Sequence, residues 1–141
     1  MTNLDNKVKH LEMIQAIINR FANNSFVLRG WSITVVSAIT AIIAKDTGNK
    51  YFITVLIPII VFWILDGYFL SRERRYRDFY DHVRTLSVKK IDFSMDTRPF
   101  KTGNNSWVNS MFSVVLLIFY GSLIGMVIFI TTLYLNEKSL F

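Results

Sequence analysis

The chain has 141 residues, of which 52% are hydrophobic and only 18% charged, and its formal net charge is +6. Length predicts one domain, and the apolar residues gather in blocks, which is typical of membrane spans. The absence of cysteine excludes disulfides, thiolate catalysis and Cys-based metal sites. With two histidines, no nucleophile beside a base and no cofactor loop, we expect neither an enzyme nor a bound metal or cofactor.

Residues 1–25 are polar and periodic, without the apolar core of a signal peptide. Leu4, Leu11 and Ile18 recur every seven residues, a pattern that predicts an amphipathic cytoplasmic helix. Such a helix has three possible partners: anionic lipid headgroups, a second copy of the chain, or the chain's own cytoplasmic loop. The sequence does not choose between lipid and protein.

Three long apolar runs follow, and a helix needs about 20 residues to cross the hydrocarbon core. They predict an all-α integral membrane domain at 26–135. Its transmembrane helices are expected at 26–44, 51–70 and 111–135, with a cytoplasmic loop at 71–110 and an external tail at 136–141. Helical spacing of apolar residues from Tyr76 to Leu86 predicts that the second span continues into the cytoplasm as one long helix.

The basic residues predict the orientation of these spans. Four precede or enter the first span, two lie between the first and second, nine lie between Ser71 and Ser110, and one lies in the tail. Loops rich in lysine and arginine stay inside. We therefore expect a multi-pass protein of the bacterial inner membrane with a cytoplasmic N-terminus and an external C-terminus.

Asp66 is a carboxylate near the cytoplasmic end of the second predicted span. Ionisable groups inside spans are rare and need a partner. Arg29 is the expected one, because both residues lie near the cytoplasmic ends of neighbouring antiparallel helices. The pair would lock the two helices together. Two alternatives stay open: pairing of Asp66 with Arg72 or Arg74, and a carboxylate that faces a water-filled path for cations.

A stripe of small and weakly polar residues marks the first span, where Thr34, Ser37 and Thr40 carry hydroxyl groups. Such a stripe is typical of helix packing. In a ring of several copies it would also suit a pore wall, because hydroxyl groups solvate passing ions.

Proline and glycine mark further positions in the second and third spans. Pro58 removes one backbone hydrogen bond and predicts a kink, and with Gly67 it is a candidate hinge. Gly121 and Gly125 have the GxxxG spacing that lets helix backbones approach closely. The spacing does not decide whether that contact lies within one chain or between chains.

The run RERRYR directly follows the second span and contains four arginines: Arg72, Arg74, Arg75 and Arg77. It is interpreted as a topology anchor that contacts anionic lipid headgroups, or as the contact for an anionic signal or a cytoplasmic partner protein. We do not expect nucleic acid as a partner, because no glycine-rich phosphate loop accompanies the run.

The segment RDFYDH, from Arg77 to His82, resembles the R-x4-H motif of HEPN ribonucleases. The resemblance implies that the two side chains act together on an RNA phosphate. It covers six residues, and that fold needs a soluble helical bundle that a loop of about 40 residues does not supply.

The stretches KHLEMIQAIINRFANNSFVLRGW and FWILDGYFLSRERRYRDFYD resemble a group of small bacterial inner-membrane proteins of unknown activity. The resemblance covers Lys9 to Asp81 and extends to the later FSMDT. These proteins are associated with mobile and anti-phage gene neighbourhoods, so the resemblance implies a membrane-damaging effector of bacterial immunity.

The expected function is therefore a homo-oligomeric channel or pore-type effector that depolarises or permeabilises the inner membrane when its cytoplasmic helices receive a trigger. The alternative from another class is a non-conducting membrane scaffold or adaptor that tethers a cytoplasmic partner through its basic loop. A membrane-anchored HEPN-like RNase is the third and least favoured.

Overall fold

The computed structural model describes residues 3–43 and 54–139, and within these ranges the chain is helical without a strand. The long helices are α1 (Asn3–Ile43), α2 (Leu56–Thr85) and α4 (Val114–Ser139). Between α2 and α4 lie the short helix α3 (Trp107–Met111) and the 3-10 turns η2 (Val88–Lys90), η3 (Arg98–Phe100) and η4 (Gly103–Asn105). The all-α prediction is confirmed for these residues.

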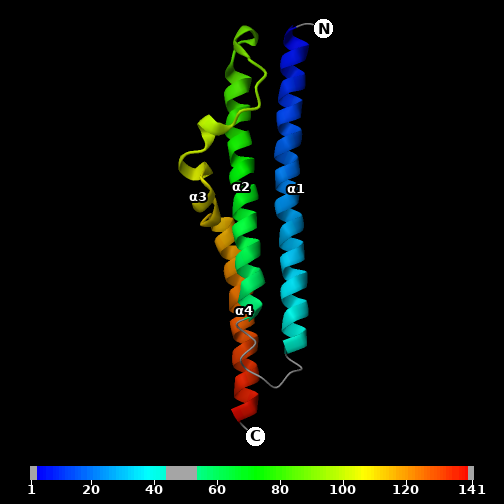
Figure 1. Ribbon diagram of the computed structural model, residues 1–141, viewed down its shortest axis with the longest axis vertical. Helices are drawn as coiled ribbons and strands as arrows, with labels where there is room; N and C mark the ends of the chain where they lie inside the picture. Colours follow the sequence, from blue (N-terminus) through cyan, green and yellow to red (C-terminus); the bar gives the residue numbers. More distant parts are fainter. Residues whose placement is uncertain (1–2, 44–53, 140–141) are drawn as a thin grey trace.

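Helices α1 and α2 form a long antiparallel pair, side by side over most of their length (Figure 1). At 1.5 Å per residue, α1 is about 60 Å long. Its buried residues recur at helical spacing from His10 to Ile43, so a single buried stripe faces α2 along the whole helix. The amphipathic segment and the first predicted span are thus one helix, without a boundary at residue 25.

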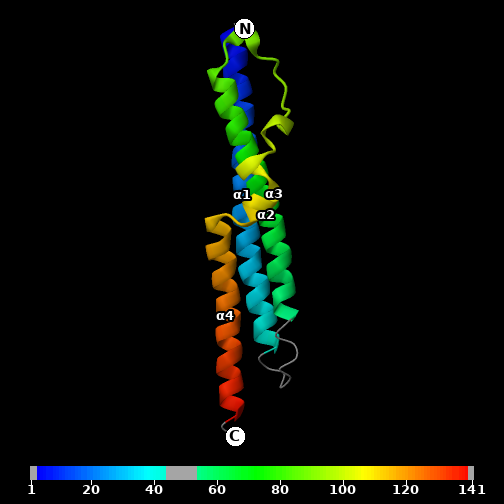
Figure 2. The ribbon, with the colours of Figure 1, turned by 90° about the vertical axis from the view of Figure 1, so that its left-hand side faces the viewer.

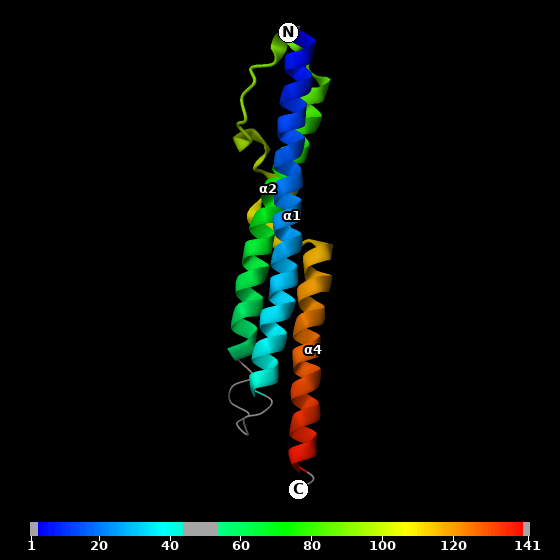
Figure 3. The same cartoon turned by 90° about the vertical axis from the view of Figure 1, so that its right-hand side faces the viewer.

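Helix α4 covers only one half of this pair, as Figures 2 and 3 show from opposite sides. That part, which we call the three-helix half, contains the C-terminal half of α1, the N-terminal half of α2 and α4. Its apolar core includes Val36, Ile59, Leu116 and Tyr120. The third apolar helix begins at Val114 rather than residue 111, because the chain turns after α3 at Phe112–Ser113.

The other part, the two-helix half, contains the N-terminal half of α1 and the C-terminal half of α2. The connection 86–113 begins beside this half and reaches the middle of α2, where α3 packs on Gly67 (Figure 2). Ile14 and Ile18 of α1 are buried in the two-helix half against Phe79 and Val83 of α2. Within this chain the buried residues of the N-terminal half of α1 therefore pack on the C-terminal half of α2, which belongs to the loop 71–110 that the sequence offered as one of three partners.

Two of the described helices, α1 and α4, are long and apolar enough to cross a membrane. Only 22% and 17% of their apolar windows are buried in the chain, whereas the core helix of a soluble protein is mostly buried. Helix α2 does not pass the same length-and-composition test. The outer ends predicted for the first and second spans, residue 44 and residues 51–53, lie outside the described residues.

Candidate functional site

Asp66 lies where the three long helices meet, and its side chain is fully buried. Arg29 Nε donates to Asp66 Oδ2 at 2.7 Å, which confirms the predicted ion pair. The hydroxyl of Ser25, one turn before Arg29, donates to Oδ1, and Tyr120 of α4 donates to Oδ2 at 3.3 Å. We call these four residues the Asp66 junction.

The Asp66 junction supplies hydrogen-bond donors and a counter-ion to a carboxylate that would otherwise be costly to bury. The carboxylate accepts hydrogen bonds from two helices other than its own, and the Arg29 side chain keeps 25% of its exposure. Such pairs stabilise only when their remaining hydrogen-bonding positions are filled, as they are here. In this conformation Asp66 joins the helices, and its side chain has no exposed surface within the described chain.

The three hydroxyl residues proposed for a pore wall do not share one face of α1. Thr40 is buried against the other helices, and its hydroxyl donates to the Val36 carbonyl at 2.7 Å. Thr34 and Ser37 are exposed, and with Gly30 and Ala41 they form one exposed face, which we call the α1 stripe. Thr40 is therefore removed from the candidate pore wall.

Neither Pro58 nor Gly67 lies at a position where α2 could bend freely. Pro58 lies in the first turn of α2, which begins at Leu56, so its missing N–H falls where helices tolerate proline. Gly67 is buried, and a Cβ there would lie 2.3 Å from Met111 Cγ of α3. Gly67 thus permits close packing of α3 on α2.

The two glycines of the GxxxG motif make no close helix contact within the described chain. Gly121 and Gly125 are exposed on α4, and a Cβ added at either would meet nothing within 4 Å. Among the described helices of this chain, none packs closely on this face.

The four arginines that follow the second predicted span have different partners. Arg72 stacks on the Tyr68 ring at 5.3 Å, Arg77 pairs with Glu73 at 2.7 Å, and Arg74 donates to the Asn104 carbonyl at 3.0 Å. Arg75 was predicted to contact lipid with the other three. Its side chain is buried instead, so it is not available to lipid. Burial lowers the pKa of its guanidinium, and neighbouring Arg72 adds to this effect.

Asn105, which sequence reasoning missed, fastens the connection 86–113 to α2. Its backbone carbonyl accepts from Ser71 Oγ at 2.7 Å and from Arg75 Nε at 3.1 Å. Its side-chain amide donates to Asp78 and to the Phe100 carbonyl. An asparagine in a polar loop carries no signal of such long-range contacts, although Gly103, two residues earlier and with φ of 62°, does indicate a turn.

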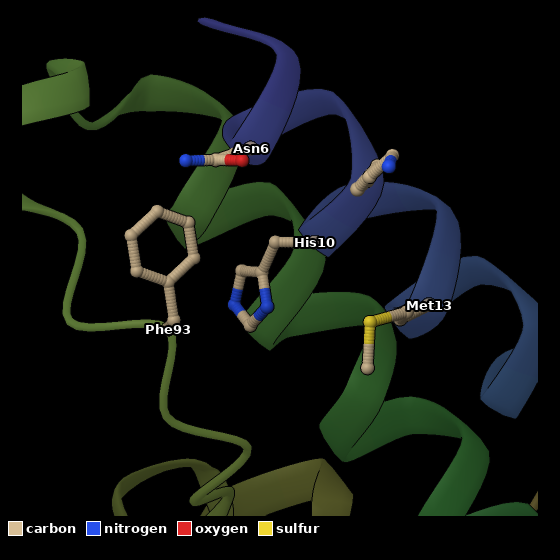
Figure 4. A pocket seen from close by; sticks show the side chains of 5 residues that line it. Asn6, His10, Met13 and Phe93 are labelled. Atoms are coloured by element: carbon tan, nitrogen blue, oxygen red, sulfur yellow. The ribbon is translucent and has the colours of Figure 1, made fainter. Parts of the chain in front are cut away.

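A hollow of about 320 Å³ lies near the beginning of α1, where Asn6, His10, Met13 and Phe93 line it (Figure 4). The His10 ring lies between Phe93 and Met13, and its Nε2 is buried without a hydrogen-bond partner among the described residues. Burial lowers the pKa of His10 below 6.5, and the nearby charge of Asp92 partly opposes this shift. The folded protein therefore favours a neutral imidazole here.

The two residues of the ribonuclease-like motif do not converge. Arg77 lines a hollow beside Asn104 and Ser113, whereas His82 lines a different one with Phe79 and Phe100. Five residues apart on a helix, they point in directions separated by about 140°. A single chain does not bring both onto one phosphate.

In the ranges that the structure describes, no group of three or more His, Cys, Asp or Glu side chains is placed to hold a metal ion. Comparison with known proteins identified no matching family model, no matching curated protein and no matching solved structure.

Proposed function

We propose that this protein is a multi-pass protein of the bacterial inner membrane whose three-helix half lies in the bilayer. The exposed surface of that half supports this placement, since Trp31, Ile60, Ile118 and Phe129 are all large, apolar and exposed. Surfaces on which many large apolar side chains are exposed mark membrane or protein contacts. The charged two-helix half would then lie in the cytoplasm, as the distribution of basic residues predicts.

The packing of α2 supports a third crossing. Ile59 and Val55 share an apolar core with Val36 and Ile43 of α1. If α1 crosses the bilayer, the first half of α2 must lie at the same depth. The Asp66 junction would lie near the cytoplasmic interface, where a charge costs less than at the bilayer centre.

Within this placement, the proposed function is a homo-oligomeric pore that depolarises or permeabilises the membrane when triggered. The α1 stripe is the single observation that carries the proposal. It leaves Gly30, Thr34, Ser37 and Ala41 exposed on the membrane half of α1, where lipid would favour large apolar side chains. Small residues let helices of neighbouring copies approach, and hydroxyl groups can solvate ions.

Ion flux through reconstituted vesicles tests this function. The purified full-length chain would be placed in phosphatidylethanolamine–phosphatidylglycerol vesicles with a potassium gradient, and a potential-sensitive dye would report its decay. We expect Ser37→Leu to slow the decay, because a large apolar side chain dries the constriction. Ile33→Leu, at an exposed position outside the stripe, should conduct like the wild type. Equal flux in Ser37→Leu and the wild type would exclude the stripe as the pore wall.

A non-conducting scaffold is the second candidate, and the Asp66 junction favours it. The carboxylate is fully buried, and the three-helix half around it has an apolar core. A scaffold needs only such a closed interior and an accessible cytoplasmic surface. Wild-type vesicles that hold their potential would move this function ahead of the pore.

A further inference from the structure

A second hollow, of about 670 Å³, lies between the basic turns of α2 and the beginning of α4. Arg74 and Arg77 line it from α2, Asn104 and Asn109 from the connection, and Ser113 from the turn that precedes α4. It is separate from the Asp66 junction, since no residue of the junction lines it. We call it the interfacial hollow.

The arginines give the interfacial hollow unused hydrogen-bond donors. Arg74 bonds to the Asn104 carbonyl and forms no ion pair with a described carboxylate. Arg77 pairs with Glu73, yet 58% of its side chain remains exposed. The one carboxylate that lines the hollow, Asp78, accepts from the Asn105 amide. A guanidinium has five N–H donors, so both arginines can still bind an anion.

The beginning of α4 adds neutral donors to the same hollow. Val114 and Val115 lie in its first turn, where backbone N–H groups have no acceptor within the helix and attract anions. Ser113 is only 9% exposed, and its hydroxyl has no hydrogen-bond partner among the described residues. An unsatisfied buried donor beside two arginines indicates a missing acceptor.

The position of the interfacial hollow indicates where that acceptor comes from. It lies where the apolar helix α4 begins, and Val114, Val115 and Ile118 form an exposed apolar surface that leads away from it. Trp107 and Phe112, shortly before α4 in the chain, have exposed rings. Exposed aromatic rings are common at membrane–water interfaces. A ligand with a phosphate and acyl chains would fill both parts.

We propose that the interfacial hollow binds the phosphate of an anionic phospholipid, whose acyl chains lie along the exposed face of α4. Arg74, Arg77, Ser113 and the first amides of α4 hold the headgroup. This inference rests on the membrane placement proposed above, and it does not require conduction. The sequence predicts a general attraction of the whole basic run to lipid, whereas this site is one defined place that uses only Arg74 and Arg77 of that run.

Native mass spectrometry of the full-length chain in detergent tests the site, with dioleoyl phosphatidylglycerol, dioleoyl phosphatidylcholine or inorganic phosphate added. We expect phosphatidylglycerol to be retained and phosphatidylcholine to be lost. Arg74→Gln with Arg77→Gln should weaken retention about tenfold. The control, Lys89→Gln with Lys101→Gln, removes the same charge from exposed positions outside the hollow and should retain the lipid.

Ser113→Ala supplies a second variant that changes no charge and leaves the helix intact. It should weaken retention about threefold through the lost hydrogen bond. Equal retention in the arginine variant and its lysine control would overturn the site. Displacement of the lipid by equimolar inorganic phosphate would overturn the lipid as its ligand. If the arginine variant fails to fold, as judged by circular dichroism, full retention by Ser113→Ala overturns the site. Vesicle flux reports on the pore independently, because a chain that retains lipid without conducting contradicts only the pore.

Discussion

Asp66 shows how one residue can hold three helices together. Asp66→Asn removes the negative charge and leaves the Arg29 guanidinium without its counter-ion. Loss of one partner from a buried pair costs several kcal/mol, and partial exposure of Arg29 reduces the expected loss to about 2 kcal/mol. Unfolding in mixed micelles with rising dodecyl sulfate would measure it. The double variant Asp66→Asn with Arg29→Gln should recover part of the loss.

The matched control for this prediction is Arg77→Gln, which breaks an exposed pair with Glu73. Exposed pairs contribute at most about 1 kcal/mol. If Asp66→Asn were no more destabilising than Arg77→Gln, the junction would not be what holds the helices together.

His10 makes the stability of the two-helix half depend on pH. Burial lowers its pKa below the ordinary value of 6.5, so as the pH falls from neutral the unfolded chain binds this proton more readily than the folded chain does. The free energy of unfolding should therefore contain the full contribution of neutral His10 well above pH 6.5, and it should decrease as the pH falls through and below 6.5. Thermal unfolding between pH 8 and pH 5 measures this loss. His10→Asn should reduce the pH dependence, whereas His82→Asn, at an exposed position, should keep it. An unchanged dependence in His10→Asn would contradict the assignment.

At the scale of elements, Gly67 governs how closely α3 packs on α2. In Gly67→Ala the new methyl group would meet Met111 Cγ at 2.3 Å and the Met111 backbone Cα at 3.1 Å. The backbone contact prevents simple relief by side-chain rotation. We expect a destabilisation of about 2 kcal/mol, in the range of overpacked cores, measured by unfolding in micelles.

Gly30→Ala is the control for that substitution, since a Cβ at Gly30 meets nothing within 4 Å. Alanine is favoured over glycine in a helix by up to about 1 kcal/mol, so this variant should be neutral or stabilised. Equal stability of the two variants would show that α3 does not pack closely on Gly67.

The helices themselves were largely predictable, because apolar blocks and helical periodicity are local patterns. The continuity of α1 through residue 25 was missed because a change from polar to apolar composition does not interrupt a backbone that lacks proline. The kink predicted at Pro58 does not follow, because the sequence does not show that α2 begins at Leu56.

The candidate site was predictable only in part. Arg29 and Asp66 were paired because charges in apolar runs are rare and need partners. Ser25, Tyr120 and Asn105 are ordinary residues whose importance comes from contacts across 41, 54 and 34 positions of the chain. Local sequence patterns carry no information on such contacts.

At the scale of the whole molecule, the two halves differ in what they expose. The three-helix half presents apolar side chains to its surroundings, whereas the two-helix half carries charged and polar ones. Helix α1 begins at one end of the molecule and α4 ends at the other (Figure 1). Inserted in a bilayer through its three-helix half, the chain would place these ends on opposite sides.

Accessibility of single cysteines tests whether the chain crosses the membrane three times. The chain has no native cysteine, so Asn3→Cys, Lys89→Cys and Asn136→Cys each report one position. Intact bacteria would be treated with a membrane-impermeant maleimide, and lysed cells would serve as the control for reactivity. We predict that Asn136→Cys reacts in intact cells, whereas Asn3→Cys and Lys89→Cys react only after lysis. Reaction of Lys89→Cys in intact cells, or protection of Asn136→Cys, would contradict this membrane placement.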